Sequence, residues 1–268
     1  DERELLPPVF ESRGVKVTVL GCGTSSGVPR IGNDWGACDP HEPKNRRRRV
    51  SVMVEAEGHT IIMDTSPDLR EQLRSAGVTR IDAVLYTHDH ADHAHGIDDL
   101  RQVFHIMRKP VDCYATPDTW RVLKARFDYV FAGGLGYPPS CVAHDLPAKL
   151  TVEPMTVTPF EQGHGPIRST GFRVDHAGHS MAYSTDISDL TLSADNAVKG
   201  VDLWIVDALR RKPHPTHSHL DRTLSWIARL RPRRAILTHM DNSMDYASLA
   251  KTLPQGVEPG YDMLTVEL

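Results

Sequence analysis

Residues 86–96 read YTHDHADHAHG and follow the apolar stretch IDAVL. The eleven residues contain four histidines and two aspartates. Histidine nitrogens and carboxylate oxygens at short spacing are typical ligands of zinc-type metals. His88 and His90 could hold one metal, and Asp92 and His93, a step further round the turn, could hold a second. The alternative is a polar loop that is merely rich in histidine, and the rest of the chain must decide between the two.

Three further residues follow other apolar strands and could complete such a site. His164 lies in EQGHGP, Asp186 in AYSTD and His239 in AILTHM. Each of them alone would more often be a structural residue. In combination with the pattern HxHxDH, they favour a metal centre with two ions.

The composition places the chain among ordinary globular proteins. Of 268 residues, 40% are hydrophobic and 25% are charged, which suits one large domain over residues 1–268. No stretch approaches the ~18 apolar residues of a membrane span, and DERELLPPVF lacks the pattern of a signal peptide. Four scattered cysteines indicate reduced thiols, so we expect a cytoplasmic protein without membrane partners. The oligomeric state stays open, with a homodimer as one option.

Strands and helices alternate along the chain, which indicates an α/β fold. Ser66 with Pro67 is expected to start one helix, and Ser218 with Asp221 another. Thr116 with Pro117 is expected to start a third. Strands are predicted at 15–20, 50–56, 60–64, 81–87, 111–115, 202–209, 233–239 and 262–268, a β-rich region at 150–183, and helices at 66–77, 116–127, 218–230 and 246–253.

The order HxHxDH, His, Asp, His resembles that of the metallo-β-lactamase superfamily over nearly the whole chain. The resemblance implies an αββα four-layer sandwich with two divalent metals in a cleft at one edge of the sheets. Zn is the first expectation, and Mn or Fe would accept the same ligands. The resemblance further implies that Asp186 bridges the metals and that Asp89 orients a ligand histidine. The implied ligands are His88, His90 and His164 for one metal and Asp92, His93 and His239 for the other.

The branches of this superfamily differ at single positions. Flavodiiron members carry Glu where His90 stands, and secreted β-lactamases carry Cys where Asp186 stands. Thioesterases and phosphodiesterases remain. The stretch LGCGTSSGVPR at 20–30 resembles a loop of the phosphoribosyl cyclic phosphodiesterases (PhnP-type) and of the tRNA nucleases. Such a loop can present backbone N–H groups to an anion, so Ser25 and Ser26 are predicted substrate contacts.

His217 is the predicted general acid, on resemblance to a cyclic phosphodiesterase histidine at the same spacing from the last metal ligand. The alternative is a histidine that only supports the start of the following helix. Together with Asp92 and Asp186, His217 completes the predicted catalytic set.

The predicted substrate is a small cyclic phosphate or nucleotide-like diester, attacked by a hydroxide that bridges the metals. A net charge of −4 does not favour long nucleic acids. Only 22 positions separate His164 from Asp186, which leaves no room for the long arm of the tRNA nucleases. The alternatives are a glyoxalase-II-like thioesterase, a tRNA 3′-processing-type nuclease and a non-catalytic nucleotide-binding protein.

The sequence alone does not fix the roles of three further features: the Cys38 and His41 region, the arginine run and a glycine-rich loop. A third metal on Cys38 and His41 is not expected, because Asn242 stands where the family pattern has a histidine. The run RRRR at 46–49 is expected to be solvated rather than to bind phosphate. The loop FAGGLGYPP at 131–139 is either a mobile lid or a turn.

Overall fold

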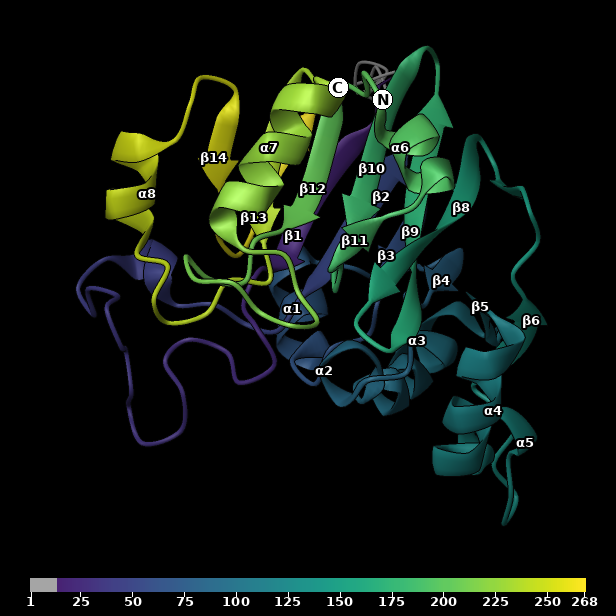
Figure 1. Cartoon of the computed structure of the whole chain (residues 1–268). Helices are drawn as coiled ribbons and strands as arrows, with labels where there is room; N and C mark the ends of the chain where they lie inside the picture. Colours follow the sequence, from purple (N-terminus) through teal and green to yellow (C-terminus); the bar gives the residue numbers. More distant parts are fainter. Residues whose placement is uncertain (1–13) are drawn as a thin grey trace, which may run out of the picture.

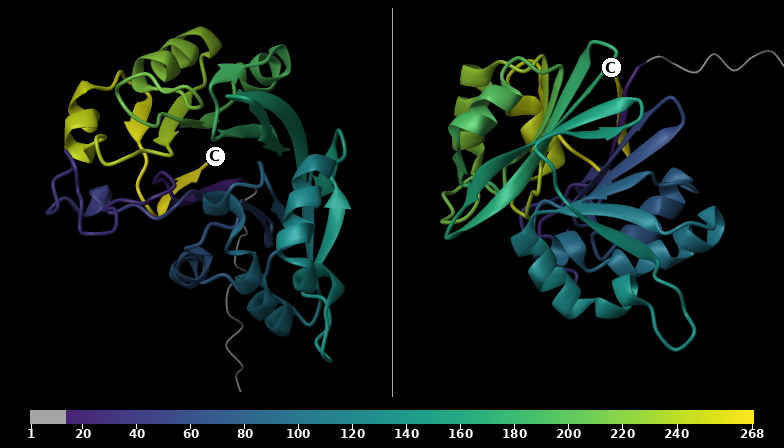
Figure 2. Two further views of the ribbon diagram at one scale, coloured as in Figure 1. Left: turned by 60° about the horizontal axis from the view of Figure 1, so that its bottom comes forward. Right: turned by 90° about the vertical axis from the view of Figure 1, so that its right-hand side faces the viewer.

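Two β-sheets face one another, and helices cover the outer face of each (Figures 1 and 2). The computed structural model describes residues 14–268. This layering is the αββα sandwich that the resemblance implied. The N-terminal stretch without a signal-peptide pattern lies outside the described residues. None of the helices within 14–268 is long and apolar enough to cross a membrane.

The first sheet has the strand order β15-β1-β2-β3-β4-β5-β6. Neighbours from β15 to β3 pair antiparallel, and those from β3 to β6 pair in parallel. The bounds are β1 Lys16–Gly21, β2 Ser51–Ala56, β3 His59–Met63, β4 Ala83–Leu85, β5 Val111–Ala115, β6 Cys141–Asp145 and β15 Leu264–Glu267.

The second sheet has the order β11-β8-β9-β10-β12-β13-β14, with β7 paired to β8. Neighbours from β11 to β10 pair antiparallel, and those from β10 to β14 pair in parallel. The bounds are β7 Leu150–Val152, β8 Met155–His164, β9 Ile167–His176, β10 His179–Ser184, β11 Asp189–Leu190, β12 Leu203–Asp207, β13 Arg234–Thr238 and β14 Val257–Pro259.

The helices divide between the two outer faces (Figure 2). On the first sheet lie α1 Leu69–Ala76, α3 Leu100–Met107, α4 Pro117–Arg126 and α5 Asp128–Ala132, and on the second α6 Leu192–Val198, α7 Leu220–Leu230 and α8 Tyr246–Thr252. The short α2 Ala91–Ala94 lies in the His-rich loop, and two 3₁₀ turns span Pro43–Asn45 and Ile97–Asp99.

Side-chain alternation builds the two apolar layers of the first sheet. On β2, Val52 and Val54 pack toward the second sheet, whereas Met53 packs toward the helices. On β3, Ile61 packs toward the second sheet and Ile62 toward the helices. Because successive strand residues point to opposite faces, an apolar run without polar gaps is required wherever both faces are covered.

Parallel pairing explains why the site lies at one edge of the sandwich. Strands β3, β4 and β5 run in the same direction in one sheet, as do β10, β12 and β13 in the other. Their carboxyl ends, and the loops that follow, therefore meet at a common edge. The end of β8 reaches the same edge, since β8 pairs antiparallel with β9 and β9 antiparallel with β10.

Two predicted helix starts are wrong. Helix α1 begins at Leu69 after Asp68. The Ser66 hydroxyl accepts the Asp68 N–H in the turn before the helix and donates to the Gln72 side chain. Helix α7 begins at Leu220 after His219, and the Ser218 hydroxyl bonds the hydroxyl of Thr223 instead of capping. The predicted start at Thr116 is confirmed, since its hydroxyl accepts from the Thr119 N–H.

The predicted strand at 111–115 matches β5, and the other predicted strands differ from the structure by one or two residues at their ends. The helices α2, α3 and α6 and the strands β6, β11 and β14 were not predicted, and α5 takes up the first two residues of the predicted 131–139 loop.

Candidate metal centre

All seven predicted metal ligands meet at the edge where the strands end. His88 and His90 follow β4, His164 ends β8, Asp186 follows β10 and His239 follows β13. Their ligand atoms form two groups, and within each group the atoms lie within 4.8 Å of one another: His88, His90, His164 and Asp186 in one, and Asp92, His93 and His239 in the other. The loop HDHADH and three distant strand ends therefore form one cluster.

Asp186 lies between the two groups. Its Oδ2 is 3.5 Å from His88 Nε2 and 3.3 Å from His164 Nε2. Its Oδ1 is 3.0 Å from His93 Nε2 and 3.2 Å from His239 Nε2. Each carboxylate oxygen thus faces one group, which is the arrangement a bridging ligand requires.

The donor set fits two divalent cations. Nε2 of His88 and of His93 is buried and, among the described residues, makes no hydrogen bond of normal geometry. The other ring nitrogen of each histidine is occupied, because His88 Nδ1 lies 3.0 Å from Thr87 Oγ1 and His93 Nδ1 lies 2.8 Å from Asp64 Oδ2. If each Nδ1 carries the proton, the lone pair of each Nε2 points into the centre and is available to a metal.

Asp64, rather than Asp89, is the carboxylate that supports a ligand histidine. Asp64 is fully buried after β3 and accepts the Thr87 N–H at 2.8 Å in addition to its contact with His93. The carboxylate of Asp89 makes no hydrogen bond to a ligand histidine in the described part of the chain, and Asp89 lines a neighbouring cleft. The role that the resemblance implied for Asp89 is therefore wrong in this structure.

The pKa directions describe a centre that attracts positive charge. Burial lowers the pKa of His88 well below its usual value. At His93 burial acts in the same direction, but Asp186, Asp92 and Asp64 outweigh it and raise the pKa well above normal. At His239 burial is again outweighed, first by Asp186, and the pKa is about 9. The carboxylates thus require cationic partners, a requirement that bound divalent metals would meet.

Three residues at this edge have left-handed backbones. Asp64, Asp186 and His239 have φ of 64°, 51° and 57°. A residue other than glycine adopts this region at a cost of about 1–3 kcal/mol, and such residues concentrate at functional sites. The turn aims each side chain from its strand end into the cluster.

His217 lies beside the ligands, supported by Asp207. Its Nδ1 is 2.9 Å from Oδ2 of Asp207, a fully buried residue at the end of β12, and its Nε2 is 3.7 Å from Asp186 Oδ2. The carbonyl of the preceding Thr216 lies 2.7 Å from His164 Nδ1. One loop thereby orients both a predicted ligand and the predicted general acid. Asp186, Asp207, His217 and His239 also form a group that could hold a cation; Oδ2 of Asp207 contacts His217, and Oδ1 makes no hydrogen bond among the described residues.

The Gly/Ser-rich loop meets the centre only in part. Ser25 lines the metal cleft, whereas Ser26 does not and its hydroxyl lies 3.4 Å from the Gly27 carbonyl. The N–H groups of Gly23, Thr24 and Gly27 already donate to backbone carbonyls. Glycine at 23 serves close packing, since a Cβ there would lie 2.9 Å from the Arg47 Cβ. The loop therefore offers less anion-binding backbone than its composition suggested.

The arginine run is structural from Arg47 onward, whereas Arg46 is exposed as expected. Arg47 is buried, and its guanidinium donates to the carbonyls of Asp241 at 3.2 Å and Met244 at 2.6 Å. Arg49 pairs with Asp68 at 2.8 Å. The Arg47 guanidinium also lies 3.8 Å from Cys38 Sγ, so the neighbour of this thiol is an arginine and not a further metal ligand. Within residues 14–268, neither Cys38 nor His41 belongs to a group placed to hold a metal.

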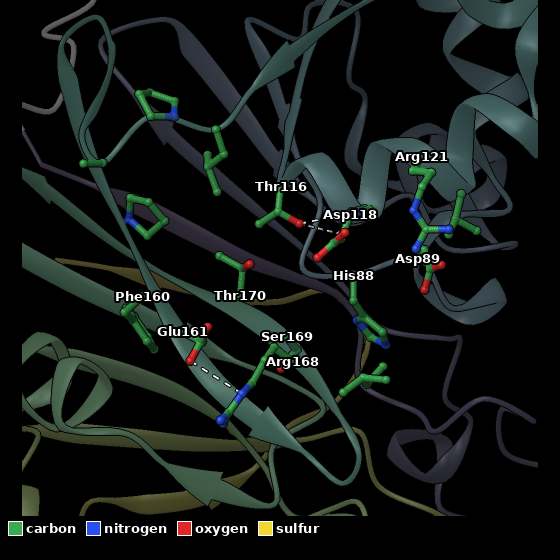
Figure 3. Close-up of a pocket in the computed structure, with 17 residues that line it drawn as sticks. His88, Asp89, Thr116, Asp118, Arg121, Phe160, Glu161, Arg168, Ser169 and Thr170 are labelled. Carbon is green, nitrogen blue, oxygen red and sulfur yellow. Dashed lines mark hydrogen bonds and ion pairs between the residues drawn. The ribbon is translucent and has the colours of Figure 1, made fainter.

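Two clefts adjoin the centre. The metal cleft, of about 240 Å³, contains Ser25, His217 and ligands from both groups. The side cleft, of about 620 Å³, lies between α4 and the β8–β9 hairpin and is lined in part by His88 (Figure 3). Ile167 belongs to both clefts. The glycine-rich loop 133–138 lines a separate cavity with Tyr129, which favours the turn interpretation over the lid.

Asp64 and Asp207 were not among the predicted site residues, although they carry the same signal that identified Asp186. Each follows or ends an apolar strand, in TIIMD and LWIVD. Thr87 and Thr216 carried no such signal, because their contacts depend on the folded loops.

The fold and the two ligand groups define a metal-dependent hydrolase with the metallo-β-lactamase fold. Residues 59–240 match the family described as beta-lactamase superfamily domain. The match covers more than half of the chain, which therefore belongs to the beta-lactamase superfamily.

Three similar proteins extend the comparison. A diphosphatase of the PhnP family has a crystal structure that superposes with a TM-score of 0.87, at 36% identity over 95% of this chain and 97% of that one. A ribonuclease Z of Mycobacterium sp. (strain KMS) is 24% identical over 95% of this chain and 96% of its own length. An octanoyltransferase of Porphyromonas gingivalis is 31% identical over 93% of this chain, which spans about half, 51%, of that relative.

Proposed function

We propose that the protein is a phosphodiesterase with two metals, acting on a small, nucleotide-like substrate. The observation that carries the proposal is the position of Asp186, whose two oxygens face two separate ligand groups with His217 beside them. The similarity to a PhnP-family diphosphatase supports phosphorus as the reacting centre.

We assign the ligands by the two groups that they form and by the oxygen of Asp186 that faces each group. His88, His90 and His164 would hold the first ion, Asp92, His93 and His239 the second, and Asp186 both. Two bound divalent ions lower the pKa of water and offset charge on the phosphoryl oxygens. Zn suits a set of imidazoles and carboxylates, and Mn and Fe accept the same donors.

The chain itself orients the substrate and supplies a proton. Asp207 holds His217 through Nδ1, which leaves Nε2 directed toward the metal cleft. From there His217 donates a proton to the departing alkoxide. Ser25, on the opposite loop, offers its hydroxyl to a phosphoryl oxygen. Asp92 and Asp186 act in the reaction as ligands rather than as acids.

The path from His164 to Asp186 supports a small substrate over tRNA. Within the described residues, this path consists of β9 and β10 joined by short turns, with no inserted arm. A tRNA 3′-processing role therefore has little structural support, despite the similarity to a ribonuclease Z.

Substrate assays on metal-loaded protein test the proposal. We expect hydrolysis of bis-p-nitrophenyl phosphate, no turnover of nitrocefin and two metals per chain by elemental analysis. Asp186→Asn should abolish most activity and reduce metal content while the circular dichroism spectrum persists. Faster turnover of S-lactoylglutathione than of every diester would establish the thioesterase alternative. Absence of turnover on all of them, with both metals bound, would leave a binding protein.

A second candidate is hydrolysis of a phosphoanhydride, which the similarity to a diphosphatase favours. The departing phosphate is a weaker base than an alkoxide and depends less on a proton from His217. Comparing ADP with a 2′,3′-cyclic nucleotide separates the two. Loss of His217 should slow the cyclic phosphate strongly and the anhydride little.

A further inference from the structure

The side cleft borders the metal centre at two residues. His88 lines it while belonging to the first ligand group, and Ile167 lines both clefts. The metal cleft of about 240 Å³ is smaller than ordinary ligand pockets, whereas the side cleft of about 620 Å³ is in their range of roughly 300–1,000 Å³. A substrate bound at the metals would therefore extend past Ile167, which lines both clefts, into the side cleft.

The charges of the side cleft disfavour a second phosphate. Arg121 stands on α4 and Arg168 on the facing hairpin, but the carboxylates of Asp89, Asp118 and Glu161 outnumber them (Figure 3). Glu161 lies 3.5 Å from Arg168 and offsets its charge locally. A polyanion would meet repulsion as well as attraction here, and an uncharged polar group would not.

The lining offers both flat apolar surface and hydroxyls. Val122, Leu146, Pro147, Pro159 and Phe160 supply the apolar part. Phe160 is mostly buried, with its ring packed against Gly171, where a Cβ would lie 2.1 Å from a ring carbon. Thr116, Thr119 and Thr170 supply hydroxyls, whereas the buried Ser169 hydroxyl already donates to the Asp186 carbonyl. Apolar walls suit a planar heterocycle, and hydroxyls suit the hydroxyls of a sugar.

We propose that the side cleft binds the nucleoside part of the substrate, its base and ribose, while the phosphodiester lies at the metals. The inference rests on the proposed function and narrows its substrate class to nucleotides. It assigns the cleft between α4 and the β8–β9 hairpin as the specificity-determining subsite.

A pair of adjacent substitutions tests this assignment. Ala148 is exposed and lines the cleft, whereas Lys149 is exposed and does not. Ala148→Trp should fill the cleft, and Lys149→Trp adds the same bulk to the same loop outside it. Calorimetric titration of the metal-loaded proteins with AMP, inorganic phosphate and pyrophosphate then measures binding without turnover.

We expect wild-type protein to bind AMP about tenfold or more tightly than phosphate, the order of gain that burial of a base against apolar walls supplies. Ala148→Trp should remove this advantage and leave phosphate affinity unchanged, and Lys149→Trp should behave as wild type. Equal affinity for AMP and phosphate, or tighter binding of pyrophosphate than of AMP, would overturn the assignment. So would an Ala148→Trp protein that binds AMP as tightly as wild type.

Failure of the proposed function is distinguishable from failure of this inference. A protein that binds AMP through the cleft but cleaves no diester would refute phosphodiesterase activity alone. A protein that cleaves bis-p-nitrophenyl phosphate but shows no preference for AMP would refute the nucleoside subsite alone.

Discussion

Asp64→Asn should weaken metal binding at the second ligand group while largely sparing the first. In the native protein Asp64 Oδ2 lies 2.8 Å from His93 Nδ1. We take His93 Nδ1 to donate to this oxygen, which leaves Nε2 free for a metal. An amide placed with its NH₂ group there would donate to Nδ1 instead, so the proton of His93 would move to Nε2 and oppose the metal.

The first group is better protected from this change. Thr87 Oγ1, which contacts His88 Nδ1, is 2.8 Å from Asp64 Oδ2 and 3.1 Å from Oδ1. Asparagine keeps an oxygen at the Oδ1 position, so Thr87 retains an acceptor. Losing a supporting contact of a ligand typically costs 10–100-fold in metal affinity, or about 1.4–2.7 kcal/mol.

Competition with a chromophoric chelator measures the two metal affinities separately. We expect the affinity of one step to fall by roughly 10–100-fold and that of the other by less than about threefold. Asp82→Asn is the control, because Asp82 likewise accepts a backbone N–H, that of Thr60 at 2.9 Å, but before β4 and away from the cluster. Two unchanged affinities, or equal losses at both steps, would refute the reasoning about the His93 proton.

Three further predictions address the proton donor, a raised pKa and the buried arginine. His217→Ala should lower kcat on a cyclic alkyl phosphate by about 10²–10⁴-fold and lower it much less on bis-p-nitrophenyl phosphate, with metal content unchanged; equal losses on both would remove the general-acid role. Burial raises the pKa of Asp262 from 3.8 to about 7, so the folded state binds its proton more tightly, and the free energy of unfolding should fall as the pH rises from 4 to 7. Because 15% of that side chain is exposed, we expect this fall to be about 1–3 kcal/mol larger in wild type than in Asp262→Asn. Urea titration at several pH values measures the difference between the two proteins, and a difference that does not change with pH would contradict the prediction. Arg47→Lys should lower the free energy of unfolding by about 2–4 kcal/mol, since one ammonium cannot reach the carbonyls of both Asp241 and Met244, whereas the exposed Arg46→Lys should change it by less than about 0.5 kcal/mol.

The metal centre was largely predictable because its densest part is local. Four of the seven predicted ligands lie within the six residues from His88 to His93, so no knowledge of the fold was needed to group them. The distant ligands were recognisable because each stands at the end of an apolar strand. Such ends meet at one edge whenever the strands run parallel.

The supporting residues were less predictable because the same local pattern serves several roles. Asp64, Asp186 and Asp207 all stand at the ends of apolar strands. Only the folded structure separates the carboxylate between the two groups from the two that hold histidine rings. The run RRRR shows the same limit, since nothing local distinguishes the buried Arg47 from the exposed Arg46.

Helix starts failed for a related reason. The Ser66 hydroxyl donates to Gln72 and accepts a backbone N–H, that of Asp68, but this contact lies in the turn before the helix, which begins at Leu69. The Ser218 hydroxyl bonds the hydroxyl of Thr223, five residues further along, instead of capping. The Thr116 hydroxyl donates to Thr119 Oγ1 and also accepts the Thr119 N–H, so it caps its helix.

The left-handed strand ends and the electrostatics of the centre lead to one conclusion about stability. Asp64, Asp186 and His239 hold left-handed backbones at about 1–3 kcal/mol each. Their strands also bring several carboxylates together in a buried site, where unneutralised charge is costly. Both costs are borne by the folded state alone, so any cation that binds only this state offsets them by mass action. The edge that gives the protein its chemistry is therefore also where its stability depends most on what is bound.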